Sequence, residues 1–291
     1  MVYVYVAAGL ANRMFHYAFA LSLAEKGRRV AIDEMTFKPR FDFETTRLTD
    51  AFENINLPAL RGRGYPIAHK KGKFFKILRR LSLFLPNYRY IERWKLDYDP
   101  DVYKKCTKNC IFLGHWVNYR YFRDCEDAVR KAFVFKPFTD NKNIRLANEM
   151  SKVNSVAVHF RKNIDYISDP ENDKRCSPDY YNKAINYMLD NTDNPRFYFF
   201  SDNWEWVEKN IKTDLPYTKV DWNPVNGAES FRDMQLMSCC KHNIIANSTY
   251  SWWGAWLNKN SEKIVVAPVS WYKIIEGDTD KNMCPDEWIK L

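Results

Sequence analysis

Short apolar runs alternate with helical segments at both ends of this chain, and this alternation restricts the fold more than any other feature of the sequence. The first unit has an apolar run at 2–7, a helical segment at 12–26 ended by Gly27, and a second run at 29–33. From about residue 150 the pattern resumes, with expected strands at 155–160, 196–200, 217–220, 243–246 and 263–267 and expected helices at 178–189, from about 204, and at 229–240. Alternation of this kind predicts α/β architecture with doubly wound parallel sheets.

The length of the chain allows two such sheets. At 291 residues, with 46% hydrophobic and 28% charged residues, the chain has the composition of a folded protein large enough for two domains. The stretch 137–143 combines Pro, Thr, Asp and Asn and is the candidate linker. We therefore expect one domain at 1–145 and a second at 146–291.

The sequence indicates a cytoplasmic protein. No segment approaches the roughly 20 uninterrupted apolar residues of a transmembrane helix, and residues 1–6 are typical of a strand rather than a signal peptide. The seven cysteines are odd in number and form no paired Cys-x-x-Cys zinc pattern. We expect buried thiols and no metal site.

The expected strand at 155–160 carries cations beyond its carboxyl end. His159 lies at this end, and Arg161 and Lys162 follow it. Ligands of open α/β sheets bind beyond the carboxyl ends of strands. Arg offers a planar fork for two phosphate oxygens, and Lys acts as a point charge. The alternative is that both cations are solvated strand-end residues.

A second anion-binding pattern lies at 244–258, where hydroxyl and amide side chains stand between an apolar run and an aromatic segment. Ser248, Thr249 and Ser251 are favourable N-cap residues for a helix that continues through 252–257. Backbone N–H groups at such a helix start bind phosphate. An ordinary capped core helix is the alternative.

Taken together, ordered motifs in this chain resemble glycosyltransferase family eleven, the α-1,2-fucosyltransferases. The matching segments, in the order of the family, are 9–18, 159–162, 200–203 and 233–242 running into 246–253. The resemblance extends from the first turn of the chain to residue 258.

The resemblance implies a GT-B-like fold, with two Rossmann-type domains facing across a cleft, the first on the acceptor side and the second for the nucleotide sugar. It also implies GDP-fucose as donor, inversion at the fucose anomeric carbon, transfer to O2 of a terminal galactose, and neither cofactor nor metal. His159 and Arg161 match a His-x-Arg-Arg motif in which Arg contacts the diphosphate. The positions implied to bind donor or substrate are Asn12, Arg13, Lys162, Asp202, Asn247, Ser248, Thr249 and Ser251.

The chain departs from the family pattern at several positions. Ala8 and Ala11 stand where the family usually has Gly, so that φ is negative there or the backbone carries a local cost. Arg13 replaces Gln in the same motif. Asp165 and Tyr166 come one residue later than in the family, which leaves open whether Lys162 or the next residue takes the place of the second Arg.

Sugar transfer from a diphosphate makes two chemical demands. Negative charge grows on the leaving phosphate, and fixed positive groups such as Arg161 and the N–H groups near 248–251 can stabilise it. The acceptor hydroxyl must also lose a proton, and Asp165 is the candidate base. Asp165 could instead hold the loop through an ion pair, and the reaction could proceed without a single base. His159 is either a proton carrier or a hydrogen-bonded structural histidine.

Other functions are compatible with parts of the sequence. Two Asp-x-Asp strings, at 97–99 and 278–280, would suit a metal-dependent GT-A enzyme, although such spacing arises readily by chance. The net charge of +9 and 16% aromatic residues would also suit a nucleic-acid-binding protein or a non-catalytic sugar-binding module.

The segment 70–85 combines basic residues with apolar residues at helical spacing and ends at Pro86. A cationic amphipathic helix suits an anionic membrane surface. This predicts peripheral attachment at the inner membrane face, near a lipid-linked acceptor. The alternative is a domain helix whose charged side faces water.

Overall fold

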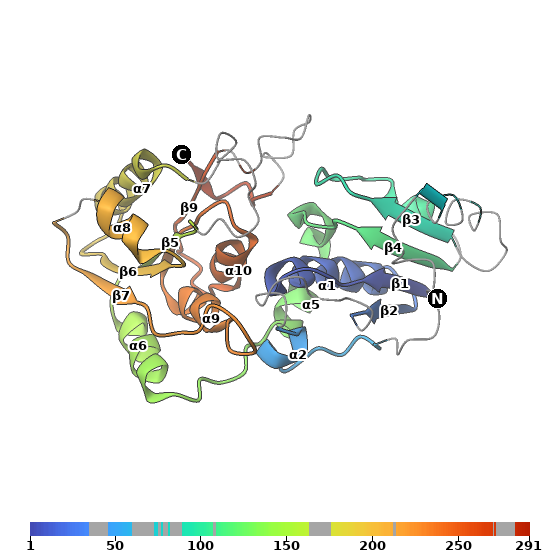
Figure 1. Ribbon diagram of the computed structural model, residues 1–291, viewed down its shortest axis with the longest axis horizontal. Coiled ribbons are helices and arrows are strands. Elements are labelled where there is room, and N and C mark those ends of the chain that lie inside the picture. Colours follow the sequence, from blue (N-terminus) through green and yellow to red (C-terminus); the bar gives the residue numbers. More distant parts are fainter. Residues whose placement is uncertain are drawn as a thin grey trace. The chain divides into compact units, whose positions relative to one another are not determined.

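The computed structural model consists of two compact units, which are described separately below (Figure 1). Unit 1 is Met1–Val134 with Gly277–Met283, and unit 2 is Phe135–Glu276 with Cys284–Leu291. The structure describes residues 1–34, 46–59, 73, 74, 77, 81, 89–106, 109–162, 176–211, 214–269, 271 and 283–291.

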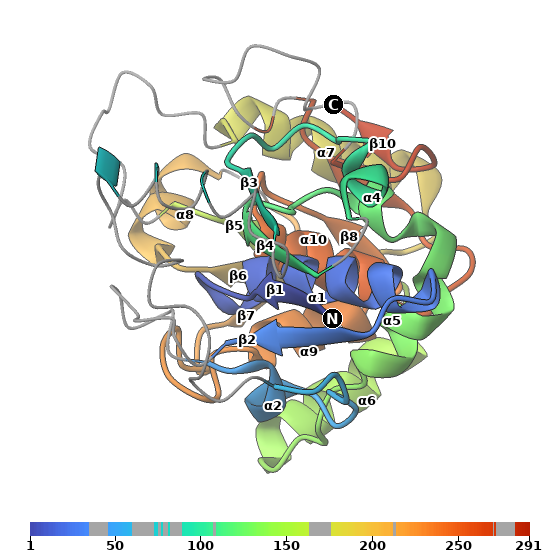
Figure 2. The ribbon, with the colours of Figure 1, turned by 90° about the vertical axis from the view of Figure 1, so that its right-hand side faces the viewer.

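Unit 1 contains a parallel sheet whose strands run in the order β2-β1-β4-β3 (Figure 2). Its strands are β1 (Val2–Tyr5), β2 (Val30–Asp33), β3 (Arg89–Arg93) and β4 (Cys110–Gly114). Its helices are α1 (Leu10–Glu25), α2 (Leu48–Ala51), α4 (Val102–Lys105), η2 (Tyr119–Tyr121), η3 (Arg123–Cys125) and α5 (Glu126–Ala132). β1 pairs with β2 on one side and with β4 on the other. The chain therefore adds strands to both sides of β1, and the switch point of this sheet lies between β1 and β4.

An aromatic cluster joins α1 to the sheet of unit 1. The ring of Phe19, on α1, stacks on Trp116 at 4.6 Å and meets Phe112 of β4 edge to face at 5.2 Å. All three side chains are fully buried. Aromatic side chains bury large apolar areas, so this cluster fixes how α1 lies on β4.

Unit 2 contains a six-stranded parallel sheet in the order β10-β9-β8-β5-β6-β7. Its strands are β5 (Ser155–Phe160), β6 (Arg196–Ser201), β7 (Tyr217–Val220), β8 (His242–Ile244), β9 (Val265–Ala267) and β10 (Ile289–Lys290). Its helices are α6 (Asn141–Lys152), α7 (Pro178–Asn191), α8 (Trp204–Asn210), α9 (Arg232–Cys239) and α10 (Thr249–Leu257).

Helices cover both faces of the second sheet, as Figure 1 shows. Val156, Val158 and Phe160 of β5 pack against α7 and α8, whereas Ala157 faces a cluster that contains α6 and α9. Because its side chains alternate between two covered faces, β5 is buried along its whole length. The expected strands and the doubly wound α/β class are confirmed.

A close contact lets α10 pack on α9. A Cβ added to Gly254 would lie 2.9 Å from the Cβ of Met237, so this glycine leaves room for the neighbouring helix. The sequence offers Ser248, Thr249 and Ser251 as N-cap residues of α10. In the structure the N-cap residue is Ser248, whose hydroxyl accepts a hydrogen bond from the N–H of Tyr250 at 3.3 Å.

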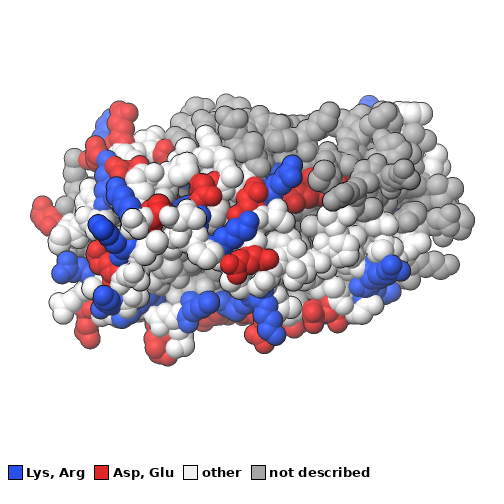
Figure 3. All heavy atoms as spheres, turned by 90° about the horizontal axis from the view of Figure 1, so that it is seen from below, with Lys and Arg blue, Asp and Glu red and all other residues white. Residues whose placement is uncertain are grey.

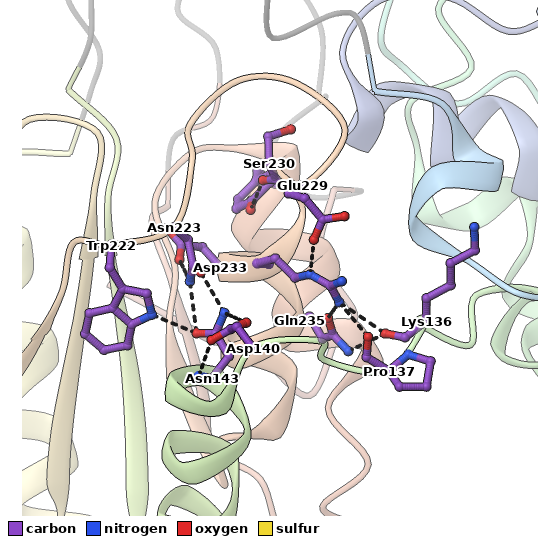
Figure 4. A network of polar contacts seen from close by, with 12 residues as sticks. Lys136, Pro137, Asp140, Asn143, Trp222, Asn223, Glu229, Ser230, Asp233 and Gln235 are labelled. Carbon is purple, nitrogen blue, oxygen red and sulfur yellow. Dashed lines mark hydrogen bonds and ion pairs between the residues drawn. The ribbon is translucent and has the colours of Figure 1, made fainter.

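Hydrogen bonds attach the segment that follows Val134 to helix α9 of unit 2 (Figure 4). The buried guanidinium of Arg232 donates to the carbonyls of Lys136 and Pro137 at 3.3 and 3.0 Å, and the amide of Gln235 also donates to Lys136. Unit 2 consequently begins at Phe135, whereas the sequence places the boundary at 145/146, inside α6.

The candidate linker is also held by its own side chains. Asp140 caps α6 by accepting from the N–H of Asn143 at 2.7 Å. The amide group of Asn143 then accepts from the indole of Trp222 and donates to Asn223, as the dashed lines in Figure 4 show. Asn223 in turn donates to Asp233 at the start of α9, so the linker residues 140 and 143 belong to the packed structure of unit 2.

Among the residues that the structure describes, none of the helices combines the length and apolarity needed to cross a membrane.

Candidate functional site

The candidate site lies within unit 2, at the carboxyl ends of β5 and β8. These neighbouring strands mark the switch point of the sheet, because the chain adds β6 and β7 on one side and β9 and β10 on the other. Ligands of doubly wound sheets bind at such a switch point. Arg161 and Lys162 follow β5, and residues 247–251 follow β8, so the two anion-binding patterns of the sequence come to the same edge.

Arg161 is held by a carboxylate from the neighbouring strand. Its Nη1 lies 2.5 Å from Oδ2 of Asp202, while Oδ1 of Asp202 accepts from the backbone N–H of Lys162 at 2.6 Å. The Arg161 side chain remains 30% exposed and that of Asp202 only 7%. Since Phe160 pairs with Ser201 in the β5–β6 register, the residues that follow each strand are brought side by side. Asp202 therefore orients a partly exposed guanidinium at the switch point.

Lys162 lies in a different environment from Arg161. Its ammonium donates to the backbone carbonyl of Cys176 and lies 3.8 Å from the centroid of the Trp206 ring on α8. The residue is only 5% exposed. These contacts tie the end of β5 to the start of α7, and we interpret Lys162 as a structural cation rather than as the phosphate ligand expected from the sequence.

Lys162→Met is expected to lower the free energy of unfolding by about 1–3 kcal/mol, because it removes a charged hydrogen bond and a cation–π contact. GDP affinity should change by less than about twofold if the ammonium is structural. Thermal unfolding and calorimetric titration with GDP measure the two effects. A variant of normal stability that no longer binds GDP would contradict this assignment.

His159 is buried beside α10. Its ring lies 5.8 Å from the ring of Tyr250, and among the residues placed in the structure its Nδ1 has no hydrogen-bond partner. Burial, and to a smaller extent the charge of Arg161, lowers the pKa of His159 to about 3. The imidazole is therefore neutral at neutral pH, which favours the structural alternative over a proton carrier.

The residues after β8 form the capped start of α10. Ser251 is fully buried and its hydroxyl donates to the carbonyl of Ser248, and Oδ1 of Asn247 lies 3.6 Å from Sγ of Cys176. Thr249 is the first residue of α10. The positive end of the helix dipole thus lies at the strand-end edge that also carries Arg161, an arrangement that attracts a phosphate.

The first motif of the sequence lies in unit 1. Asn12 is in the first turn of α1. Arg13 is buried, and its guanidinium donates to the carbonyls of Ala8 at 2.7 Å and Thr46 at 2.9 Å and pairs with Glu34 at 3.1 Å. These bonds hold the loop after β1, so they give Arg13 a structural role in unit 1.

Ala8 adopts a φ of 71°, the conformation that glycine usually supplies. The sequence leaves open either a negative φ at Ala8 or a conformational cost. The structure has the positive φ, which costs on the order of 1–2 kcal/mol for a non-glycine residue. The bond from Arg13 to the Ala8 carbonyl helps to hold this conformation.

The structure groups the predicted residues by unit. His159, Arg161, Lys162, Asp202 and residues 247–251 lie in unit 2, and Asn12 and Arg13 lie in unit 1. Asp165, the candidate base, lies outside the described residues. The Arg161–Asp202 pair is absent from the sequence predictions, which name both residues but not their contact.

In the Asp-x-Asp string that the structure describes, both carboxylates form ion pairs. Asp97 pairs with Arg93 at 2.8 Å, and Asp99 pairs with Lys105 at 2.5 Å and with Arg93 at 3.7 Å. The string at 278–280 lies outside the described residues.

Two parallel α/β units, one of them with an oriented arginine and a helix start at its switch point, have the architecture of a GT-B-like fold. The model of Glycosyl transferase family 11 matches residues 65–291, and the chain belongs to this family. It is 32% identical to the O-antigen biosynthesis glycosyltransferase WbnK of Escherichia coli, with both chains covered in full. It is 30% identical to an α-1,2-colitosyltransferase of Escherichia coli, over 98% of this chain and 97% of that protein.

Solved structures show the same fold. The NodZ α-1,6-fucosyltransferase of Bradyrhizobium, in a crystal soaked with GDP-fucose, aligns with a TM-score of 0.56 at 14% identity, over 88% of this chain and 91% of NodZ. Arabidopsis thaliana FUT1 in complex with GDP aligns with a TM-score of 0.52 at 11% identity, over 91% of this chain and 70% of FUT1. The expected family and the GT-B-like fold are thus confirmed, and the chain is a glycosyltransferase.

Proposed function

We propose that this glycosyltransferase moves L-fucose from GDP-fucose to O2 of a terminal galactose on a glycan, with inversion at the anomeric carbon and without a metal ion. The observation that carries the proposal is the Arg161–Asp202 pair at the switch point of unit 2 in a member of family 11. Supporting it, the solved structures of similar fold include those of the NodZ α-1,6-fucosyltransferase with GDP and with GDP-fucose.

Arg161 supplies the charge that the departing diphosphate requires. As the sugar–phosphate bond breaks, negative charge develops on the phosphate oxygens, and a guanidinium already fixed by Asp202 needs little reorganisation to stabilise it. The start of α10 adds backbone N–H groups and its dipole from the neighbouring strand. In this proposal, Asn247, Ser248, Thr249 and Ser251 shape the phosphate-binding turn, while Asn12 belongs to the acceptor side.

Deprotonation of the acceptor hydroxyl remains assigned to Asp165. His159 is buried beside Tyr250 and poorly placed to meet an acceptor hydroxyl, which leaves the carboxyl as the candidate base in the motif. Asp165→Asn would then lower kcat and leave GDP affinity close to that of the unaltered enzyme. Unchanged turnover would exclude this carboxyl as the base.

The donor sugar is tested by a screen of GDP-linked sugars against galactose-terminated acceptors, read by the mass of the product. We expect GDP-fucose to be used best. GDP-colitose is the informative competitor, because colitose is fucose without the 3-hydroxyl and one relative is a colitosyltransferase. Preference for GDP-colitose would replace the proposed donor, and product at a hydroxyl other than O2 would replace the proposed linkage. Loss of turnover with a chelator, restored by manganese, would overturn the metal-free mechanism.

The alternative functions have less support. A non-catalytic sugar-binding module is disfavoured by the match to glycosyltransferases across the full chain. On the face in Figure 3, the described Lys and Arg side chains are interspersed with Asp and Glu instead of forming one basic surface, which gives no support to nucleic-acid binding.

We also propose that the acceptor is lipid-linked and that the segment 70–85 contacts an anionic membrane. Most of this segment lies outside the described residues, but Phe74, Ile77 and Leu81 are 64%, 54% and 56% exposed at helical spacing. Flotation with vesicles that contain anionic lipid should recover the protein at low salt, and Ile77→Asp should reduce the recovery. Equal recovery of both proteins, or of neither, would remove this proposal.

A further inference from the structure

Unit 1 has its own switch point, between β1 and β4, and the function proposed above places only Asn12 near it, on the acceptor side. His115 directly follows β4, and Trp94 directly follows the neighbouring strand β3. A transferase of this kind binds two substrates. Since the donor is assigned to the strand ends of unit 2, the strand ends of unit 1 are the place to seek acceptor contacts.

Trp94 is an exposed tryptophan on a firmly held turn. The residue is 59% exposed, and its ring meets the ring of His115 edge to face, with centroids 5.5 Å apart and planes at 84°. Arg93 holds the turn, because its guanidinium donates to the carbonyl of Asp97 at 2.8 Å and pairs with the carboxylate of the same residue. An exposed tryptophan has only two side-chain dihedral angles, so it binds a ligand with a small loss of side-chain entropy.

The backbone brings His115 against the end of β3. The N–H of His115 donates to the carbonyl of Arg93 at 2.7 Å. Gly114 makes this approach possible, because it has a φ of 118° and a Cβ there would lie 1.7 Å from the same carbonyl oxygen. The spacing between His115 and Trp94 is therefore set by the main chain.

Two histidines lie near this edge, and one of their ring nitrogens has no hydrogen-bond partner among the described residues. Burial lowers the pKa of His115, so the ring is neutral and offers one donor and one acceptor. Behind it, Nδ1 of the buried His16 accepts from the N–H of Ala7 at 3.4 Å, which places the proton on Nε2. Within the described part of the chain, Nε2 of His16 has no hydrogen-bond partner.

We propose that Trp94 and His115 form the acceptor-sugar subsite. The apolar C–H face of a terminal pyranose, of the galactose type, stacks on the exposed indole, and the imidazole of His115 forms a hydrogen bond with a hydroxyl at the edge of the same ring. This inference deepens the proposed function and rests on it for the identity of the sugar.

The kinetic test compares Trp94→Ala, Trp94→Phe and His115→Ala with Val225→Ala, a control at a 60% exposed position of unit 2. We expect Trp94→Ala to raise the acceptor KM about tenfold or more with less than a twofold change in the donor KM. Trp94→Phe should restore most of the acceptor affinity, whereas a merely structural role would raise both KM values. An unchanged acceptor KM in Trp94→Ala would overturn the subsite.

A binding test separates this inference from the proposed function. Saturation-transfer NMR with lactose should show contact to the galactose ring in the unaltered protein and lose it in Trp94→Ala. If Trp94→Ala loses this signal but the unaltered protein transfers no sugar from any GDP-sugar, the subsite is retained and the proposed function is refuted. Retention of the signal in Trp94→Ala, with normal transfer by the unaltered enzyme, would refute the subsite alone.

Discussion

Replacement of Arg161 by alanine is expected to lower kcat by about 10²–10³-fold, the range found when one fixed group that stabilises transition-state charge is removed. The guanidinium lies at the switch point beside the start of α10 and is oriented by Asp202. The free energy of unfolding should fall by about 1–3 kcal/mol, because the Asp202 carboxylate is only 7% exposed and loses its ion pair, although it keeps its bond from the backbone N–H of Lys162. Steady-state kinetics and thermal unfolding measure the two quantities.

Two companion variants identify which property of Arg161 matters. Arg161→Lys keeps the charge but not the planar fork, so its kcat should fall between those of the unaltered enzyme and the alanine variant. Asp202→Asn keeps the guanidinium and weakens its orientation, and a smaller loss of kcat is expected with GDP still bound. Near-normal turnover by Arg161→Ala would refute its role, and turnover lost together with folding would make it structural.

The location of this arginine could be predicted from the sequence, but its partner could not. The apolar run 155–160 followed by Arg161 indicates a strand-end cation, and the structure confirms the strand. Pairing with Asp202 depends on β5 and β6 being neighbours in a register that aligns Phe160 with Ser201. An Arg directly after one expected strand and an Asp directly after the next would predict this ion pair if the two strands were assumed to be parallel neighbours.

The environment of Lys162 is the basis of our interpretation that this strand-end cation is structural, a role that the GDP titration of Lys162→Met tests. Its ammonium lies over Trp206, and this residue comes from α8, beyond the neighbouring strand. Only the packing of α7 and α8 on the same face of the sheet brings the two together. Periodicity predicts that these helices exist, but the direction of a long cationic side chain depends on tertiary contacts.

The sequence pattern does not predict the two strands in the middle of unit 1, β3 and β4. The strand β3 reads Arg89-Tyr90-Ile91-Glu92-Arg93 and lies at the edge of its sheet, where charged residues are common, so it lacks the apolar pattern of β5. The strand β4 is a short apolar run, which periodicity alone does not distinguish from part of a buried helix. Trp94 and His115 have a proposed role because they follow these two strands. A sequence that does not predict β3 and β4 therefore does not indicate a role for either residue.

Gly114→Ala is expected to reduce the stability of unit 1 by on the order of 4 kcal/mol or more, a large part of the roughly 5–15 kcal/mol that stabilises a folded domain. Two causes combine: the φ of 118° is unfavourable for any residue with a Cβ, and that Cβ would lie 1.7 Å from the carbonyl oxygen of Arg93. The main chain must move, which breaks the bond from the His115 N–H to this oxygen. Denaturant unfolding and the yield of soluble protein measure the effect.

Gly27→Ala is the matched control, because Gly27 also has a positive φ, of 76°, but a Cβ there meets nothing within 4 Å. Its cost should be limited to about 1 kcal/mol, that of the backbone conformation alone. The difference between the two variants therefore measures the close approach of β3 and β4 at Gly114. Equal losses of stability would show that His115 and Arg93 are not held together as the structure indicates, and the geometry on which the acceptor subsite depends would fail with them.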